Sequence, residues 1–356
     1  MPTRLIIVGG FLGAGKTTLL LTAANHLVQQ GYRVGLVTND QGEDLVDTAT
    51  ADQATIPVTE VAGGCFCCRF PDLLQGLQRL QTSVNPDIIL AEPVGSCTDL
   101  VATVLRPLAQ LHGEQYHLAP LTVLLDGTRD LAHFSSNVHY LYQQQLAEAE
   151  LILLNKIDQL TPAQQRTQLD GLRNRYPQAH PLLLAARQGL GVAEWLEIAL
   201  GQVSRNPAAL LIDYTRYAEA EAALGWLNAK GLVRADDPFA AATWVEQLLT
   251  GLAQRFAAAN AAIAHIKTLV TTPVANLKAS ITQAGGPVTW DVVAATTETT
   301  QLDFLLNVRV HAPPPLLATV VEQTLAATKP QPGARHYFEH FECFSPLPPK
   351  PTYRME

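Results

Sequence analysis

The sequence predicts an α/β domain with a mainly parallel sheet, followed by a smaller α+β domain at the C-terminal side. Three observations predict this fold. Short apolar runs alternate with helical patterns as far as about residue 200, as in parallel sheets that helices cover on both faces. A glycine-rich loop follows the first apolar run. After about Gly201 the alternation stops, and an alanine-rich helical pattern stands among strand-like segments.

The first part of the chain is expected to hold seven strands. They lie near residues 4–9, 33–38, 58–61, 87–91, 120–126, 151–155 and 181–185. Helical patterns lie between most of them, including residues 16–30, 71–81, 98–111 and 162–176. In such sheets ligands bind at the carboxyl ends of the strands, so the polar residues that follow each strand are candidates for a site.

The second part begins after a plausible linker at residues 202–207. A strand is expected near residues 218–227, although the alanine-rich stretch 217–224 fits a helix equally well. A helix is expected at residues 238–260 and another at 314–327, with strands near 263–271, 274–283 and 302–310. We therefore predict a first domain at residues 1–201, a smaller domain at 208–330 and a proline-rich tail at 331–356.

Residues 10–17 read G-F-L-G-A-G-K-T, a complete G-x-x-x-x-G-K-[ST] motif between a strand and a helix. The backbone N–H groups of such a loop and the N-terminus of the helix bind phosphates. We expect Lys16 to reach the β- and γ-phosphates and the Thr17 hydroxyl to bind Mg²⁺. The motif predicts a P-loop NTPase domain. Its predicted nucleotide contacts are Gly10, Gly13, Ala14, Gly15, Lys16, Thr17 and Thr18.

Glu92-Pro93-Val94-Gly95 follows the strand at 87–91 and is expected at its carboxyl end. An acidic residue there can organise Mg²⁺ and the attacking water, and the Gly95 N–H can contact the γ-phosphate. Glu92 and Gly95 therefore join Lys16 and Thr17 as predicted catalytic residues. Thr17 and Glu92 are the predicted magnesium ligands.

The strand at 151–155 ends in Asn155-Lys156-Ile157-Asp158, the N-K-x-D motif that recognises guanine. The Asp158 carboxylate can accept hydrogen bonds from two donors of guanine that adenine lacks, so the motif favours GTP over ATP. Asn155 would tie neighbouring loops together, and the Lys156 stem would cover the base. Ala186, after the next strand, is the further candidate for a backbone contact to the guanine carbonyl. The motif also disfavours an ATP-dependent kinase.

Three of the five cysteines stand together in Cys65-Phe66-Cys67-Cys68, after two glycines. Thiolates are soft ligands that suit Zn²⁺ and metals of similar softness. Small buried side chains and a redox pair are the alternatives. Three cysteines leave a tetrahedral site incomplete, and the missing ligand would be water, a carboxylate, Cys97 or a group from a partner protein.

The motifs G-F-L-G-A-G-K-T-T-L-L, G-G-C-F-C-C, E-x-x-G and N-K-I-D, in this order, resemble the CobW-like family of P-loop GTPases. The resemblance covers roughly residues 4–200. It implies a GTP-hydrolysing metallochaperone that binds Zn²⁺ or Co²⁺ at Cys65, Cys67 and Cys68. It also implies a client metalloprotein or cofactor-synthesis enzyme as the partner that receives the metal. Because no arginine finger or catalytic glutamine can be assigned, we expect slow intrinsic turnover.

Residues 39–43, with Asp47 after them, resemble the first switch of that family. The family usually has N-E-F-G-E there, whereas this chain has N-D-Q-G-E, with Asp40 at the position of the glutamate. The polar stretch 39–57 is therefore expected to be a nucleotide-dependent switch, with an ordinary surface loop as the alternative.

The tail holds His336, His340, Glu342 and Cys343 within one short stretch. On a helix the two histidines would share a face and could bind metal. An aromatic strand that docks the tail is the favoured alternative.

Composition also limits which partners we expect for this protein. The formal net charge of -8 and the absence of Lys/Arg runs argue against a nucleic-acid partner. No apolar stretch approaches the roughly twenty residues that span a bilayer, so we expect no membrane partner and a cytoplasmic protein. The competing hypothesis is a nucleotide-gated regulatory or scaffold GTPase whose cysteines are structural.

Overall fold

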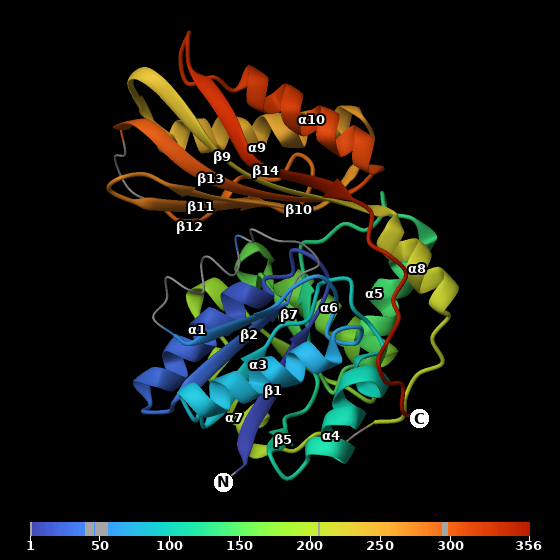
Figure 1. The fold of residues 1–356 in the computed structure, drawn as a ribbon. Coiled ribbons are helices and arrows are strands. Elements are labelled where there is room, and N and C mark those ends of the chain that lie inside the picture. The colour runs from blue at the N-terminus through green and yellow to red at the C-terminus, as the bar shows by residue number, and fades with distance from the viewer. Residues whose placement is uncertain (1, 40–45, 47–55, 206, 294–297) are drawn as a thin grey trace.

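A computed structural model describes residues 2–39, 46, 56–205, 207–293 and 298–356. It shows an α/β domain with a second sheet and its helices stacked on one end (Figure 1). The first sheet contains the strands β1 (Thr3–Gly9), β2 (Val34–Asn39), β3 (Val58–Val61), β4 (Ile88–Ala91), β5 (Tyr116–Leu118), β6 (Thr122–Asp126), β7 (Leu151–Asn155) and β8 (His180–Leu183).

These strands pair in the order β3-β2-β4-β1-β6-β7-β8, with β5 beside β1, and each pairing is parallel. Strands β4, β6 and β7 are buried along their whole length, as expected for strands covered on both faces. The predicted mainly parallel sheet is therefore confirmed. Its carboxyl ends face the second domain.

Six α-helices of the described residues surround this sheet. They are α1 (Lys16–Gln29), α3 (Phe70–Ser83), α4 (Arg106–His112), α5 (Ser136–Glu148), α6 (Pro162–Arg175) and α7 (Val192–Gly201). One face packs Leu19 of α1 and Trp195 of α7, and the other packs Leu73 and Leu77 of α3. The helix expected at 98–111 instead begins as a π-helical turn at Val101–Leu105. Pro107 has no N–H to donate to the preceding turn, which interrupts the regular helical ladder there.

The second sheet is antiparallel and has the order β12-β11-β10-β13-β9-β14. Its strands are β9 (Leu224–Ala240), β10 (Ala262–Thr271), β11 (Asn276–Ile281), β12 (Thr289–Val292), β13 (Glu298–His311) and β14 (Arg335–Phe344). Helices α9 (Ala241–Ala258) and α10 (Pro314–Ala327) cover the face that points away from the first domain (Figure 1).

The prediction of a strand near 218–227 was wrong over its first half, and the alternative of a helix is correct there. That stretch lies in helix α8 (Tyr214–Ala222), and β9 starts only at Leu224. The side chain of Asp213 caps α8 by accepting hydrogen bonds from the N–H groups of Thr215 and Arg216. Tyr217 and Ala220, one helical turn apart, are both fully buried, so the helix has an apolar face to dock.

The two domains share an apolar core. Trp226 of β9 and Ala264 of β10 belong to the same buried cluster as Phe11 and Leu12 of the glycine-rich loop. A polar contact adds to it, since the Val46 N–H donates to the Asn307 side chain of β13 at 2.9 Å. The second sheet thus rests directly on the glycine-rich loop. The domain limits given above stay a prediction, and β14 places part of the stretch 331–356 inside the second sheet.

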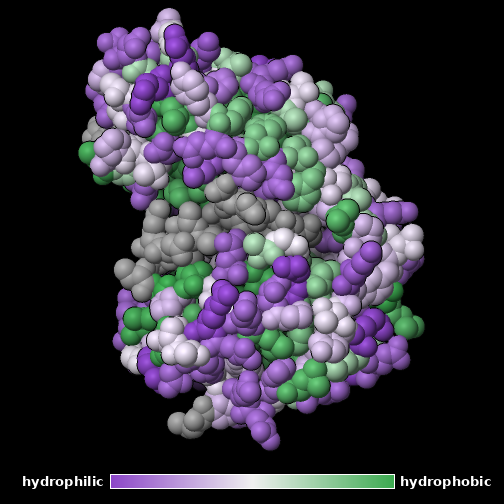
Figure 2. Space-filling model, in the orientation of Figure 1, coloured by the Kyte–Doolittle hydropathy of each residue, from purple (hydrophilic) through white to green (hydrophobic). Residues whose placement is uncertain are grey.

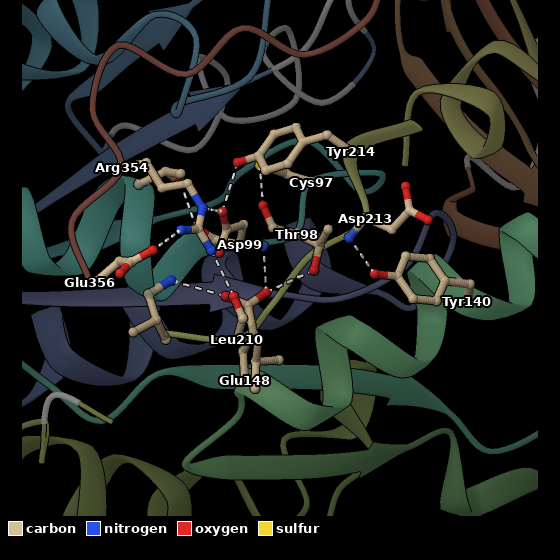
Figure 3. A network of polar contacts seen from close by, with 12 residues as sticks. Cys97, Thr98, Asp99, Tyr140, Glu148, Leu210, Asp213, Tyr214, Arg354 and Glu356 are labelled. Atoms are coloured by element: carbon tan, nitrogen blue, oxygen red, sulfur yellow. Dashed lines mark hydrogen bonds and ion pairs between the residues drawn. The ribbon is translucent and has the colours of Figure 1, made fainter. Parts of the chain in front are cut away.

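After β14 the chain returns to the first domain, along α8 and towards α4 (Figure 1). Within this tail the Arg354 guanidinium pairs with the Asp99 carboxylate at 3.0 Å, and the Met355 N–H donates to the Ala102 carbonyl at 2.8 Å. Figure 3 shows these charged groups gathered beside Glu148 and Tyr214. The tail therefore bonds to the first domain, although the whole second sheet lies between them in the sequence.

On the face shown in Figure 2, hydrophilic side chains are spread widely among hydrophobic ones. None of the helices in the described part of the chain combines the length and apolar character that crossing a bilayer requires.

Glu148, at the end of α5, holds the turn after β4 in place. Its carboxylate accepts hydrogen bonds from the Thr98 hydroxyl at 2.8 Å, the Asp99 N–H at 2.7 Å and the Val101 N–H at 3.0 Å (Figure 3). Burial raises the pKa of Glu148 to about 7, and the donated hydrogen bonds limit that rise. The folded protein therefore binds a proton at Glu148 more tightly than the unfolded chain does.

We predict that this carboxyl gives the free energy of unfolding a pH dependence. Between its ordinary pKa near 4.5 and about 7 the folded state holds the proton that the unfolded state has lost, so stability falls as pH rises through this window. The loss should be on the order of 2–3 kcal/mol. Urea unfolding at pH 5 and pH 8 measures it. Glu148→Gln should flatten this slope, whereas Glu114→Gln at an exposed site should keep it; equal slopes in all three proteins would contradict the prediction.

Candidate nucleotide and metal site

The glycine-rich loop adopts a conformation that only glycine adopts easily. Gly10 has φ 131° and Gly15, which precedes α1, has φ 100°. A Cβ at Gly10 would meet the Leu124 carbonyl oxygen, and one at Gly15 would lie 2.6 Å from the Asn155 side-chain nitrogen. The loop is thus pressed against β6 and the end of β7. Its shape follows from the glycine spacing in the motif.

The charged groups predicted for phosphates and magnesium converge on the start of α1. Lys16 Nζ donates to the Gly10 carbonyl at 2.9 Å and lies 3.8 Å from the Glu92 carboxylate. The Thr17 hydroxyl donates to the other Glu92 oxygen at 2.9 Å. All three side chains are nearly buried. A hydroxyl and a carboxylate side by side are an oxygen donor pair of the kind that Mg²⁺ prefers.

Gly95 lies against the glycine-rich loop from the other side. A Cβ there would come within 2.9 Å of the Leu12 backbone nitrogen, so only glycine permits this close approach. Glu92 and Gly95 therefore border the same cleft as Lys16 and Thr17. The structure brings the four predicted catalytic residues together.

Asn39, the last residue of β2, ties three segments together with its side-chain amide. Its Nδ2 donates to the carbonyls of Val61 and Gly64, each at 2.7 Å. Its Oδ1 accepts from the N–H groups of Phe66 at 3.0 Å and Val94 at 3.2 Å. A single buried amide thus connects the cysteine-containing loop to the loop that carries Glu92 and Gly95.

The guanine motif lies at the other end of the cleft. Asn155 Nδ2 donates to the Ala14 carbonyl at 2.8 Å, and its Oδ1 accepts from the Ala186 N–H at 2.9 Å. Asn155 thus ties two loops together, as its position in the motif predicts. Asp158 is exposed and lines the cleft, where its carboxylate is accessible to a base.

Lys156 adopts a left-handed backbone conformation with φ 63°, and its Nζ donates to the Asp126 carboxylate at 2.7 Å. Asp126 is buried. Although burial alone would raise its pKa, the nearby charges of Lys156 and Arg129 hold the pKa of Asp126 below its usual value. Asp126 therefore fixes the lysine stem at the edge of the cleft.

Most of the predicted nucleotide contacts line this one cleft. Those that do are Gly13, Gly15, Lys16, Thr17, Thr18, Asn155, Lys156, Asp158 and Ala186. Gly10 and Ala14 lie behind its wall, where their carbonyls accept from Lys16 and Asn155. The opposite wall belongs to the second sheet, through His265, Lys267, Lys278 and Thr282 among others. The sequence carries no motif that predicts this contribution.

Sequence reasoning missed the structural roles of two residues. Arg129 is buried and donates to the carbonyls of Leu12 at 2.8 Å and Thr282 at 2.7 Å, which bridges the two domains. Asn39 was noted only as part of a switch. The signal that could have found Arg129 was its place in Asp126-Gly-Thr-Arg129, directly after an apolar strand.

The three cysteines predicted as metal ligands gather in one cluster after β3. Their sulfurs lie 2.7 Å apart for Cys65 and Cys67, 3.3 Å for Cys65 and Cys68, and 3.7 Å for Cys67 and Cys68. Cys65 and Cys67 are buried and Cys68 is half-buried. Among the residues that the structure describes, this is the one compact group of three or more potential ligands from His, Cys, Asp and Glu.

A fourth thiol stands beside the cluster. The Cys97 sulfur lies 3.9 Å from that of Cys67. Hydrogen bonds from Cys65 and Cys67 lower the pKa of Cys97 to about 6, whereas hydrogen bonding with Cys65 and burial raise the pKa of Cys68 to about 11. The cluster therefore favours an ionised sulfur at its buried end.

The C-terminal tail covers the exposed side of the cluster. The Lys350 N–H donates to the Cys68 sulfur at 3.1 Å, and the Thr352 N–H donates to the Cys67 carbonyl at 2.8 Å. Tyr353 packs edge-on against Phe70, with ring centroids 5.3 Å apart. The tail thus lies on the cysteines by both backbone and aromatic contacts.

The remaining candidate ligands lie elsewhere. His336, His340 and Cys343 belong to β14, and the Cys343 thiol donates to the Pro314 carbonyl at 3.2 Å. The docked aromatic strand is therefore the correct alternative for the histidine-containing stretch. Asp40 and Asp47, with most of the predicted switch at 39–57, lie outside the described residues.

Comparison with known proteins identifies relatives that match part of this chain. The zinc chaperone YeiR of Escherichia coli (strain K12) is 34% identical over 167 residues, which cover 45% of this chain and 48% of that protein. The zinc chaperone CobW of Pseudomonas aeruginosa is 33% identical over 188 residues, covering 43% of this chain and 48% of that protein. The chain thus spans about half the length of the curated relatives it matches.

A crystal structure of Zn(II)-bound YjiA GTPase from E. coli aligns with 92% of this chain and 99% of its own, with a TM-score of 0.38 and 17% identity. The family model described as CobW/HypB/UreG, nucleotide-binding domain, matches residues 4–183. That segment makes up half of the 356 residues and holds the glycine-rich loop, the cysteine cluster, Glu92, Gly95 and the N-K-x-D motif. The chain therefore belongs to the CobW/HypB/UreG family of P-loop nucleotide-binding domains, as its motifs predicted.

Proposed function

We propose that the protein is a GTP-hydrolysing metallochaperone. It binds GTP in the cleft between the two domains and a zinc-type metal ion at Cys65, Cys67 and Cys68. It delivers that ion to a client metalloprotein or cofactor-synthesis enzyme. Support comes from the family, from its zinc-chaperone relatives and from the geometry of the cysteine cluster. A cytoplasmic location stays a prediction.

Guanine selectivity is assigned to Asp158. Its exposed carboxylate borders the cleft, while Asn155 holds the adjoining loops and Lys156 is fixed by Asp126. A carboxylate accepts hydrogen bonds from the two adjacent donors of guanine. Adenine lacks these donors, so ATP would leave the carboxylate unpaired. Ala186, whose N–H donates to the Asn155 side chain, also borders the cleft, and its backbone contact to the guanine carbonyl stays a prediction.

Hydrolysis is assigned to the group around the start of α1. Lys16 contacts the β- and γ-phosphates, and Gly95 contacts the γ-phosphate through its N–H. Mg²⁺ would be held by Thr17 and Glu92 and would neutralise charge on the phosphates when bound. Glu92 also orients the attacking water. Arg129 donates to backbone carbonyls of both domains, so we assign it to positioning the glycine-rich loop. We expect slow turnover in the absence of a client.

The observation that carries the proposal is the Asn39 amide. It bonds both to Gly64 and Phe66, which flank Cys65, and to Val94 in the loop between Glu92 and Gly95. Movement of that loop on loss of the γ-phosphate therefore changes the support of the cysteine loop. GTP would favour the metal-holding arrangement and hydrolysis would favour release.

The second candidate is a regulatory GTPase whose cysteines are structural. The burial of Cys65, Cys67 and Cys97 favours it, because buried thiols pack like small apolar side chains. The two functions differ in whether metal affinity depends on the bound nucleotide.

We predict that Zn²⁺ binds more tightly in the presence of a non-hydrolysable GTP analogue than with GDP. Coupling of this kind changes affinity by about 5–150-fold, and the same factor should appear in the affinity for the analogue. Titration against a competing chelator measures it. Cys67→Ala should abolish tight binding, and Cys343→Ala, in β14, should leave it unchanged. Equal zinc affinity with the analogue and GDP would favour the regulatory GTPase.

We predict that Asp158→Asn weakens GTP binding by at least about 100-fold, because the amide turns a donor towards the donors of guanine. ATP binding should change little. Equilibrium titration with fluorescent GTP and ATP analogues measures both. Asp170→Asn, at an exposed site on α6, is the matched control. An equal loss for both nucleotides would show that Asp158 supports the loop instead of selecting the base.

We predict that Asn39→Asp uncouples zinc from the nucleotide. The substitution keeps the acceptor for Phe66 and Val94 but loses the donors to Val61 and Gly64. Zinc and the GTP analogue should each still bind, and the ratio of zinc affinities with analogue and GDP should fall to within about twofold. Asn174→Asp on the exposed side of α6 is the control. An undiminished ratio would place the coupling elsewhere.

A further inference from the structure

Cys97 is the one cysteine near the cluster that lies outside the Cys-x-Cys-Cys motif. It follows Gly95 and Ser96, so it lies on the loop that borders the nucleotide cleft. Its sulfur is 3.9 Å from Cys67, while Cys68 lies on the tail-covered side of the cluster. The four sulfurs are therefore contributed by two loops that Asn39 holds together.

Three of the six sulfur pairs lie near the spacing of a tetrahedral ion. Zinc–sulfur bonds of about 2.3 Å place the corners of a tetrahedron about 3.8 Å apart. The pairs Cys65–Cys68, Cys67–Cys68 and Cys67–Cys97 lie at 3.3, 3.7 and 3.9 Å. To admit the ion, Cys65 and Cys67, at 2.7 Å, have to separate, and Cys97, which lies outside the compact group of the other three, has to approach them.

The backbone at Cys97 is held from several sides. Gln145 donates to the carbonyls of Gly95 at 3.0 Å and Cys97 at 2.8 Å. The Ser96 hydroxyl donates to the Glu221 carboxylate at 2.6 Å, and the Thr98 N–H donates to the Tyr217 hydroxyl at 3.3 Å. These partners are all buried. The thiol is therefore pre-positioned at the cluster, as a ligand has to be.

We infer that Cys97 is the fourth ligand of the metal site, which then holds Zn²⁺ or Co²⁺ by four thiolates. This assignment rests on the proposed function. Binding replaces each remaining S–H proton with a metal–sulfur bond and releases that proton to solvent, with no transfer of electrons. Water, a carboxylate and a partner's ligand are the alternatives that the assignment excludes.

The assignment gives the nucleotide a direct path to the metal. Gly95, two residues before Cys97, approaches the backbone of Leu12 in the glycine-rich loop so closely that a Cβ would lie 2.9 Å from its nitrogen. A shift of Gly95 on loss of the γ-phosphate therefore moves Cys97 relative to the other three sulfurs. The site changes from four ligands to three, and an open position is what exchange with a client requires.

X-ray absorption on the full-length zinc-loaded protein with a GTP analogue tests the assignment without any substitution. Four sulfur neighbours at about 2.3 Å are expected. Three sulfurs with one oxygen or nitrogen would overturn the assignment of Cys97 and leave the proposed function standing. Failure of the wild-type protein to bind zinc would overturn both.

Substitution of Cys97 provides a second test of the assignment. Cys97→Ser should still bind zinc, with three sulfur neighbours and an affinity at least about tenfold lower, since even the loss of a second-shell partner costs that much. Cys343→Ser, at a half-buried thiol in β14, is the matched control and should match the wild type. Cobalt-loaded samples give an independent readout, because the sulfur-to-cobalt absorption should weaken only in Cys97→Ser. Unchanged affinity and absorption in Cys97→Ser would overturn the assignment.

Discussion

The side-chain amide of Asn39 is the interaction on which the arrangement of the site depends. It has two donor hydrogens and one acceptor oxygen, and all of them are used within a buried environment. A neutral amide offers two donor hydrogens to carbonyls while its oxygen accepts from N–H groups. Neither a hydroxyl nor a carboxylate could replace it, because each lacks the second donor. The cysteine loop and the Glu92 loop are therefore fixed relative to each other by one residue at the end of β2.

Around this centre the two domains supply different parts. The parallel sheet presents the phosphate, base and cysteine loops at its carboxyl ends, which is the general property of such sheets. The antiparallel sheet closes the cleft with polar side chains and is anchored there by Arg129 and by the apolar contacts of Trp226 and Ala264. The predicted nucleotide cleft and the contact between the two domains therefore share one surface, so a change in one affects the other.

The parallel sheet and the motif residues were predictable because their signals are local. The glycine spacing dictates the loop at Gly10–Lys16, and continuous apolar runs mark strands such as β6 and β7. What escaped prediction depends on contacts between distant segments. Arg129 acquires its role only when β10 and β11 fold over the glycine-rich loop. The sequence left strand and helix open at Tyr217, and the helix is correct because its apolar face meets the first domain. The limits of β9, which runs through Pro238, also follow from pairing with β13 rather than from local preference.

The tail across the cysteine cluster has a consequence for any acceptor of the metal. Residues near Lys350 and Thr352 already occupy the accessible side of Cys67 and Cys68, and β14 tethers them there. A tethered segment competes at an effective concentration on the order of millimolar. An acceptor that offers only weak surface contacts would not displace this tail segment. An acceptor that binds the tail or β14 would move the segment off the cysteines as it binds. Under the proposed function, residues 350–352 would thus set a minimum affinity for an acceptor, and this threshold would select among proteins before the metal is exposed.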